Sequence, residues 1–227
     1  MKLVIKFPTR GRSNKFLNVL KKYVDFLNDK STQIIVTCDN DDTDMNCDLV
    51  KDVISQYPNV KLCISDNKSK IEAVNADLGG VNFDIVLLAS DDMIPMVKGF
   101  DTIIKDKMLE HYSDTDGVLW FNDGYQGNKL NTLCILGKKY YDRFGYIYNP
   151  EYISVWSDNE FMDVGNLLCK QTYFDEVIIK HQHPDWGFGN RDDVHSLNSK
   201  FESHDRGVYN KRKETNFGIW RQHSIPC

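Results

Sequence analysis

Long apolar segments are missing from this chain of 227 residues. No run approaches the ~20 consecutive apolar residues that a membrane-spanning helix requires. Met1 and Lys2 lead directly into a strand-like segment, without the charged and apolar regions of a signal peptide. We therefore expect a soluble, cytoplasmic protein that has no transmembrane segment.

Paired cysteine motifs and an excess of positive charge are also missing. The six cysteines, none of them in a CxxC pair, are Cys38, Cys47, Cys63, Cys134, Cys169 and Cys227. Their scatter predicts free thiols and no structural zinc. The formal net charge of -5 argues against general binding to nucleic acid. No repeat, low-complexity tract or linker divides the sequence, so we expect one domain over residues 1–227.

Strand and helix patterns alternate through the first half of the chain. Strand-like apolar segments occupy residues 2–7, 33–38, 60–65 and 83–89. Between them, apolar residues recur at helical spacing in residues 13–27, where Ser13 is the expected cap, and in residues 48–56 and 71–78. Strands separated by helices of this length predict right-handed βαβ units and an α/β fold with a mostly parallel sheet.

The pattern changes beyond residue 112. Residues 117–122 and 131–136 are typical of two strands joined by a turn, which predicts a mixed or antiparallel extension of the sheet. A short helix over residues 138–144, a helix beginning at Ser157 and a strand-like run over residues 177–180 follow.

Ser90, Asp91 and Asp92 stand where the apolar run of residues 83–89 stops. The carboxyl ends of parallel strands are where open α/β sheets place their ligands. Two adjacent carboxylates there repel each other unless a divalent cation or a hydrogen-bonding ligand lies between them. The purely structural alternative is an Asx turn followed by a helix capped near Pro95.

Two later constellations carry both a chemical and a structural interpretation. Asp158 and Glu160 lie at a helix start, where Ser157 with Glu160 also fits a capping box. His181 and His183 follow a strand-like run, and alternation along an extended chain places both on one side. They are candidate metal ligands or satisfied surface histidines.

Trp156 ends a stretch rich in aromatic residues that also contains Tyr146, Tyr148 and Tyr152. Aromatic rings beside a cleft stack on sugars, although packing in the core is the commoner role. Trp156 is therefore a candidate contact for an acceptor.

The order of these motifs resembles that of a family 2 glycosyltransferase with the nucleotide-diphospho-sugar (GT-A) fold. The resemblance runs from Lys2 to about Asp192 and implies a three-layer α/β/α sandwich whose mostly parallel central sheet has a mixed C-terminal extension. It also implies that residues 1–112 bind the nucleotide sugar. Residues 113–227 would then bind the acceptor, carry the catalytic groups and end in a helical tail.

The resemblance assigns candidate roles residue by residue. Its nucleotide-sugar-binding positions correspond to Pro8, Thr9, Arg10, Asp39, Lys70, Asn75, Ser90 and Asp91. The D-x-D metal motif corresponds to residues 90–92, with Ser90 in place of the first acid, so Asp92 would be the chief metal ligand. His183, or else His181, would complete the protein ligands of Mn²⁺ or Mg²⁺, and imidazole favours Mn²⁺.

The implied reaction moves a sugar from a nucleotide diphosphate sugar, with a UDP-sugar favoured, to a glycan or another hydroxyl acceptor. Asp158 is the first candidate for the general base of an inverting displacement, and Glu160 is the second. The sequence shows no anchor, and peripheral contact with a membrane-bound acceptor is compatible with it.

Two other function classes stay open at this point. A metal-dependent phosphoesterase or nucleotidyltransferase would also use Asp91, Asp92 and a His-x-His motif, but no second dense cluster of acids and histidines supports a two-metal site. A non-catalytic module that binds a sugar nucleotide or a glycan would use the same fold without a base.

Overall fold

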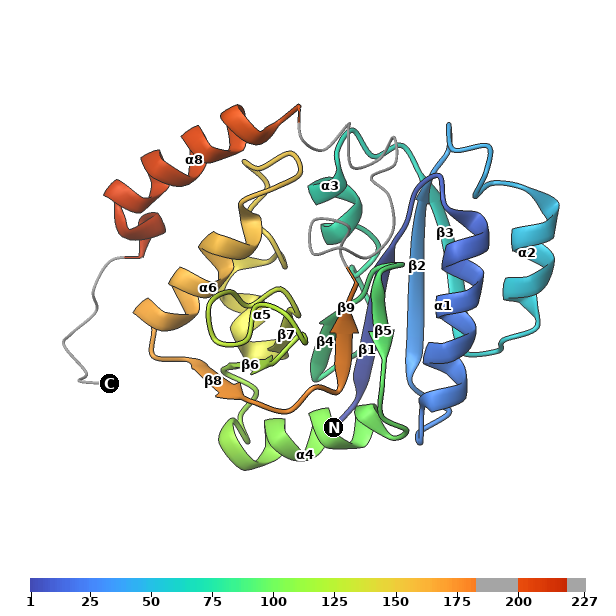
Figure 1. Cartoon of the computed structure of the whole chain (residues 1–227), viewed down its shortest axis with the longest axis horizontal. Coiled ribbons are helices and arrows are strands. Elements are labelled where there is room, and N and C mark those ends of the chain that lie inside the picture. Colours follow the sequence, from blue (N-terminus) through green and yellow to red (C-terminus); the bar gives the residue numbers. More distant parts are fainter. Residues whose placement is uncertain (183–199, 220–227) are drawn as a thin grey trace.

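A seven-stranded sheet forms the centre of the computed structural model, which describes residues 1–182 and 200–219 (Figure 1). Its strand order is β3-β2-β1-β4-β7-β6-β8. The first four strands along the chain are mutually parallel neighbours: β1 (Leu3–Pro8), β2 (Gln33–Asp39), β3 (Val60–Ser65) and β4 (Ile85–Leu88). The predicted parallel half of the sheet is thereby confirmed.

The second half of the chain extends this sheet in mixed orientation, as predicted. β7 (Ile135–Gly137) is antiparallel to both β4 and β6 (Val118–Phe121), whereas β8 (Gln171–Phe174) is parallel to β6. β5 (Met93–Pro95) and β9 (Ile179–His181) pair in a separate antiparallel sheet. The sequence did not predict β5 or β8. The alternative of an Asx turn followed by a helix capped near Pro95 is wrong, because Pro95 ends the strand β5.

The helices agree with the sequence patterns, and α4 adds one that was not predicted. They are α1 (Ser13–Phe26), α2 (Asp48–Ser55), α3 (Lys70–Asn75), α4 (Phe100–His111), α5 (Lys138–Phe144), α6 (Ser157–Leu167) and α8 (Glu202–Glu214), followed by the 3-10 turn η2 (Asn216–Gly218). Within the described part of the chain, none of the helices has the length and apolar character needed to cross a membrane.

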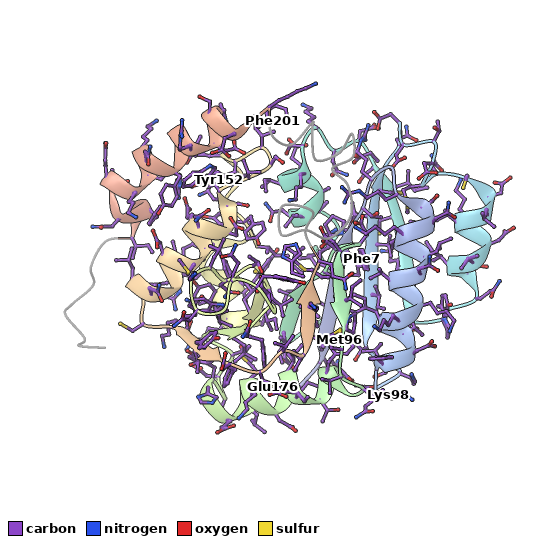
Figure 2. All side chains as sticks on the ribbon, viewed as in Figure 1. Phe7, Met96, Lys98, Tyr152, Glu176 and Phe201 are labelled. Carbon is purple, nitrogen blue, oxygen red and sulfur yellow. The ribbon has the colours of Figure 1, made fainter. Side chains whose placement is uncertain are left out.

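Two apolar cores, one on each face of the sheet, make a three-layer α/β/α structure. Alternate residues of β1 point to opposite cores: Phe7 lies with α1, and Val4 belongs to the core that α3, α5 and α6 cover. The ring of Phe7, which is labelled in Figure 2, makes edge contacts with Phe16 at 5.1 Å and Tyr23 at 5.7 Å between centroids. α1 and α2 lie towards one end of the sheet, and α5, α6 and α8 towards the other (Figure 1).

The start of α1 differs from the prediction. Arg12, rather than Ser13, is the N-cap residue of α1. The Arg12 side chain makes no capping hydrogen bond to the helix. Asp44, from the loop after β2, instead accepts hydrogen bonds from the backbone N–H of Ser13 at 2.7 Å and from its hydroxyl at 2.8 Å. A carboxylate at a helix N-terminus suits the helix dipole. The contact holds the turn after β1 against the end of β2.

The cysteines agree with the expectation at four described positions. Cys38, Cys47, Cys63 and Cys134 are free thiols. Cys169 is disulfide-bonded, so the expectation of a free thiol is wrong there.

A fully buried lysine lies inside the parallel sheet. The ammonium of Lys6 contacts the Thr37 hydroxyl and lies 3.8 Å from the carboxylate of Asp77. Thr37 in turn donates to Asp77 at 2.5 Å. Burial lowers the pKa of Lys6 to about 8, although Asp77 favours its charged form.

We expect the stability that Lys6 confers to increase with pH. Below pH 8 both the folded and the unfolded chain carry the charge, so the folded state bears the full cost of burying it. Between about pH 8 and pH 10.5 the folded state loses the proton first, which removes that cost. The free energy of unfolding of the wild type minus that of Lys6→Met should rise by up to about 3 kcal/mol over this range. Urea unfolding of both proteins at several pH values measures it, and a flat difference would contradict the prediction.

Candidate active site

A cleft of about 890 Å³ opens at the carboxyl ends of the parallel strands. Most of the residues singled out from the sequence line it: Pro8, Thr9, Arg10, Asp39, Lys70, Ser90, Asp91, Asp92, Trp156, Asp158 and His181. Asn75 and Glu160 are not among its lining residues, and His183 lies outside the described residues. The cleft therefore gathers side chains from both halves of the chain.

Arg10 and Asp39 form one wall of the cleft. The guanidinium of Arg10 donates to Asp39 at 2.6 Å and makes two further bonds, of 2.7 and 2.9 Å, to Asp41. Its hydrogen bonds to Asp41 and Asp39 raise the pKa of Arg10 above its ordinary value. The second oxygen of Asp39 accepts from the amide of Asn67 at 2.9 Å. Sequence reasoning missed Asn67, because an isolated asparagine after a strand carries no recognisable pattern.

Asp91 is paired with cations from the start of α1. Arg12 donates to Asp91 at 2.9 Å, and the Lys15 ammonium lies 3.4 Å from the same oxygen. Burial raises the pKa of Asp91 and outweighs the opposing effect of Arg12. These two cations were not predicted as partners of the acidic pair. Asp91 therefore lies beside two cationic side chains, whereas Asp92 does not share these contacts.

Asp92 faces His181 across the small sheet. The pairing of β5 with β9 sets Met93 opposite His181, and the backbone carbonyl of Asp92 accepts from Gln182 N–H at 2.7 Å. An oxygen of the Asp92 carboxylate lies 3.6 Å from Nε2 of His181. Burial opposes the charge on Asp92, but the contact with His181 and the hydrogen bond from the Ser90 hydroxyl hold the pKa of Asp92 well below its ordinary value.

The donor set at this point fits a divalent cation. One carboxylate and one imidazole, Asp92 and His181, lie side by side on the lining of the cleft. Oxygen and nitrogen donors of this kind suit Mn²⁺ and, less well, Mg²⁺. In residues 1–182 and 200–219 no group of three His, Cys, Asp or Glu side chains gathers around one point. Among the described residues, a metal at this point would therefore be bound by two side chains, those of Asp92 and His181.

Asp158 lines the cleft at the start of α6. Its carboxylate accepts from the backbone N–H of Asn159 at 2.9 Å. Solvent still reaches part of the side chain, yet protein surrounds it on most sides, and this burial raises the pKa of Asp158 against the opposing charge of Lys70. A carboxylate with a raised pKa is a stronger base while it remains ionised at neutral pH.

Trp156 precedes Asp158 in an uncommon backbone conformation. Its φ of 65° lies in the left-handed region, which a bulky residue rarely adopts. It is the N-cap residue of α6, and no side-chain hydrogen bond caps this helix. The predicted capping box of Ser157 and Glu160 is therefore wrong.

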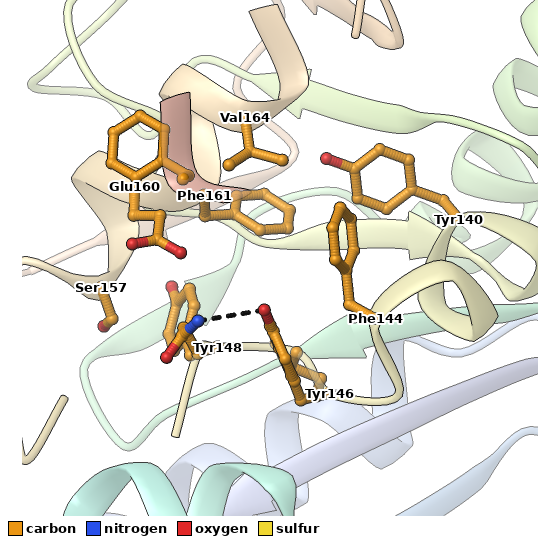
Figure 3. A pocket seen from close by; sticks show the side chains of 11 residues that line it. Tyr140, Phe144, Tyr146, Tyr148, Ser157, Glu160, Phe161 and Val164 are labelled. Carbon is orange, nitrogen blue, oxygen red and sulfur yellow. Dashed lines mark hydrogen bonds between the residues drawn. The ribbon is translucent and has the colours of Figure 1, made fainter. Parts of the chain in front are cut away.

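Glu160 lies on the other side of the α6 start, away from the cleft. Its carboxylate pairs with the Arg212 guanidinium at 2.8 and 3.0 Å and accepts from the Tyr152 hydroxyl at 2.8 Å. Figure 3 shows it beside a small pocket of about 20 Å³ whose lining includes several aromatic side chains. A tertiary ion pair has replaced the local capping role that the sequence suggested.

Asn75 also has a structural partner. Its side-chain oxygen accepts from the backbone N–H groups of Ile147 and Tyr148 at 2.9 and 3.1 Å, and its amide donates to the Tyr148 carbonyl at 2.7 Å. The side chain thus holds the chain at Tyr148, which does line the cleft. Asn75 itself is not among the residues that line the cleft, and its contact with a nucleotide sugar stays a prediction.

No protein-family model and no curated protein matches the sequence. Solved structures do. A mannosyltransferase, PcManGT from Pyrobaculum calidifontis in complex with GDP-Man and Mn²⁺, superimposes with a TM-score of 0.67 and 13% identity over 82% of this chain and 58% of its own. S. aureus TarS 1–349 in complex with UDP-GlcNAc gives 0.64 and 15% identity over 86% of this chain and 61% of its own.

The chain has a GT-A-like fold. A third structure, S. aureus TarS 1–349 in complex with UDP, covers 98% of this chain and 74% of its own with a TM-score of 0.63 and 15% identity. The chain spans 58% of the length of the mannosyltransferase.

We expect Arg12 to be needed for keeping Asp91 charged in this GT-A-like cleft. The pair is buried, with Arg12 11% and Asp91 6% exposed. Arg12→Met should lower the free energy of unfolding by about 3 kcal/mol at pH 7, because it leaves a buried carboxylate without its closest cation. Adding Asp91→Asn should recover most of the loss.

Lys15→Met is the matched control, because its side chain is 44% exposed and the change should cost less than about 1 kcal/mol. Urea unfolding at pH 7 compares the wild type, Arg12→Met, the double variant Arg12→Met/Asp91→Asn and Lys15→Met. Equal losses for Arg12→Met and Lys15→Met would contradict the prediction.

Proposed function

We propose that this protein is a glycosyltransferase of the family 2 type that transfers a sugar from a nucleotide diphosphate sugar to an acceptor hydroxyl. The observation that carries the proposal is the meeting of Asp92, His181 and Asp158 in one cleft beside Arg10 and Asp39. The GT-A-like fold supports it, because the similar solved proteins carry GDP-Man or UDP-GlcNAc.

The donor would lie along the carboxyl edge of the first four strands. In our proposal Pro8, Thr9 and Arg10 contact the nucleoside together with Asp39, which the Arg10 guanidinium and the Asn67 amide orient. Lys70, Ser90 and Asp91 continue the donor site, with residues 1–112 as the donor half and residues 113–227 as the acceptor half. A UDP-sugar remains the favoured donor.

Asp92 and His181 would hold a divalent cation, Mn²⁺ in preference to Mg²⁺, and His183 remains a proposed further ligand. When bound, such a cation supplies charge stabilisation for the diphosphate leaving group. The protein's own part is to keep Asp92 ionised, which the Ser90 hydroxyl and His181 do from two sides. The backbone N–H of Gln182 also donates to the Asp92 carbonyl at 2.7 Å, directly beside the pairing of β5 with β9.

Asp158 would be the general base, and its position in the cleft favours it over Glu160. It would take the proton of the acceptor hydroxyl as that oxygen attacks the anomeric carbon from the face opposite the diphosphate. The new glycosidic bond forms as the bond to the diphosphate breaks, so the configuration at the anomeric carbon inverts. Trp156, two residues earlier, is the proposed contact for a glycan or other hydroxyl acceptor.

The function is tested with a panel of nucleotide sugars and Mn²⁺. Glycosyltransferases supplied with water in place of an acceptor should release the nucleoside diphosphate slowly and from a preferred donor. A phosphoesterase or nucleotidyltransferase would instead yield the nucleoside monophosphate. A module without catalytic activity would bind a donor and release nothing, and either of these results would refute the proposal.

Asp158→Asn should separate chemistry from folding. It preserves the shape of the side chain but removes the base, so donor hydrolysis should fall by about 10²- to 10⁴-fold, while affinity for the donor and the melting temperature stay near those of the wild type. Measuring all three quantities on each variant gives the comparison.

Glu160→Gln is the paired variant with the opposite expectation. It weakens the buried contact with Arg212, so the free energy of unfolding should fall by about 2 kcal/mol, with little change in the hydrolysis rate well below the melting temperature. If Glu160→Gln were the inactive variant, the assignment of the base would be reversed.

Asp92→Asn and His181→Ala should each weaken Mn²⁺-dependent binding of UDP by at least about tenfold, because each removes one of the two described side chains that would bind the cation. Calorimetric titration of UDP with and without Mn²⁺ measures the effect. Lys15→Met serves as control, since it changes charge near the same acidic pair without removing a ligand. Unchanged Mn²⁺ dependence in His181→Ala would assign the ligand role to His183.

A further inference from the structure

α8 presents one face to the segment that precedes the proposed base. The four residues on this face are Glu202, Asp205, Tyr209 and Arg212, whose spacing of three, four and three residues puts them on one side of a helix. All four contact residues 151–160, the segment that contains Trp156 and Asp158. In Figure 2, Phe201 marks the start of α8, and the label of Tyr152 marks this segment.

Asp205 makes the most of these contacts. Its side chain is fully buried and accepts from three consecutive backbone N–H groups, those of Ile153 at 3.1 Å, Ser154 at 2.8 Å and Val155 at 2.8 Å. His204 contributes a further contact at 2.9 Å. Burial opposes the charge of Asp205, but the contact with His204 and the three N–H groups hold its pKa below the ordinary value.

The segment that Asp205 holds is part of the cleft itself. Ile153, Ser154 and Val155 all line it, and the Ile153 carbonyl accepts a bond of 3.3 Å from the backbone N–H of Ile71 in α3. The chain then passes directly into Trp156, whose left-handed backbone needs support from its surroundings.

Two further contacts from α8 fix Trp156. Its indole N–H donates to Glu202 at 3.0 Å, and its ring lies 5.1 Å from the ring of Tyr209. Arg212 holds Glu160 on the far side of Asp158. The base is therefore flanked on both sides by residues that α8 holds.

We infer that Asp205 is a positioning residue that sets Trp156 and Asp158 in the cleft by fixing the backbone of residues 153–155. The inference rests on the proposed function and adds to it the element that orders the acceptor side. The proposed donor side is built by the strand ends, and within residues 1–182 and 200–219 the hydrogen-bond partners of the Asp205 side chain are Ile153, Ser154, Val155 and His204, none of them a donor-side residue. Loss of Asp205 should therefore affect catalysis and leave donor binding unchanged.

The test compares Asp205→Asn with Asp101→Asn. Asp101 is also fully buried and accepts from two consecutive backbone N–H groups, of Asn28 and Asp29 at 2.9 Å each, but it does not line the cleft. Both variants should lose stability. Asp205→Asn should lower the rate of donor hydrolysis by about tenfold to a hundredfold at a temperature where both are folded, whereas Asp101→Asn should keep it. Affinity for UDP with Mn²⁺ should stay the same in both.

A second readout does not depend on activity. The protein labelled with 5-fluorotryptophan has four tryptophans, and the ¹⁹F resonance of Trp156 is assigned by its loss in Trp156→Phe. Asp205→Asn should shift or broaden this resonance, and Asp101→Asn should not. If Asp205→Asn does not fold, Glu202→Ala, which changes an exposed side chain, should shift the same resonance.

The inference is overturned if the Trp156 resonance is unchanged in Asp205→Asn or, where that variant does not fold, in Glu202→Ala. It is equally overturned if Asp101→Asn loses hydrolysis as strongly as Asp205→Asn. Failure of the proposed function looks different: the wild type itself would release no nucleoside diphosphate, and the resonance would still decide whether Asp205 holds the segment.

Discussion

The cleft depends on how two adjacent carboxylates are kept at the end of β4. Asp91 and Asp92 repel each other, and both are buried, so each requires its own compensation. The turn after β1 and the start of α1 supply Arg12 for Asp91, whereas the small β5–β9 sheet brings His181 to Asp92. One acid is thus tied to the N-terminal half of the chain and the other to the C-terminal half. The parallel sheet provides the edge, and these two pairings hold the acidic side chains of the candidate site in place there.

The sequence predicted the elements that depend on local pattern. The strands β1 to β4 alternate with amphipathic helices, and burial on both faces makes the strands nearly continuous apolar runs, so their parallel sheet could be anticipated. β5 could not, because three residues are too short to show a period of two, and its pairing with the predicted strand β9 joins segments far apart in the chain.

The same distinction separates the site residues that were anticipated from those that were not. Asp39 and Asp92 sit at strand ends, where topology alone brings them to the cleft. Glu160 satisfied the local pattern of a capping box, yet a buried pair with Arg212, 52 residues later, provided a stronger partner for its carboxylate. The side-chain oxygen of Asn75 likewise accepts hydrogen bonds from the backbone N–H groups of Ile147 and Tyr148, which lie 72 and 73 residues later in the chain. No local pattern contains such partners.

Rigidity in this cleft is therefore of two kinds. On the proposed donor side, hydrogen-bonded neighbouring strands fix where each side chain emerges. On the proposed acceptor side, residues 153–155 have no strand partner, and a left-handed Trp156 costs roughly 1–2 kcal/mol relative to the ordinary helical region. Each net hydrogen bond to a charged group contributes about 1.5–3 kcal/mol, so the three backbone bonds to Asp205 are sufficient to offset that strain. A helix from the end of the described chain can thus determine the geometry of a loop that no sheet supports.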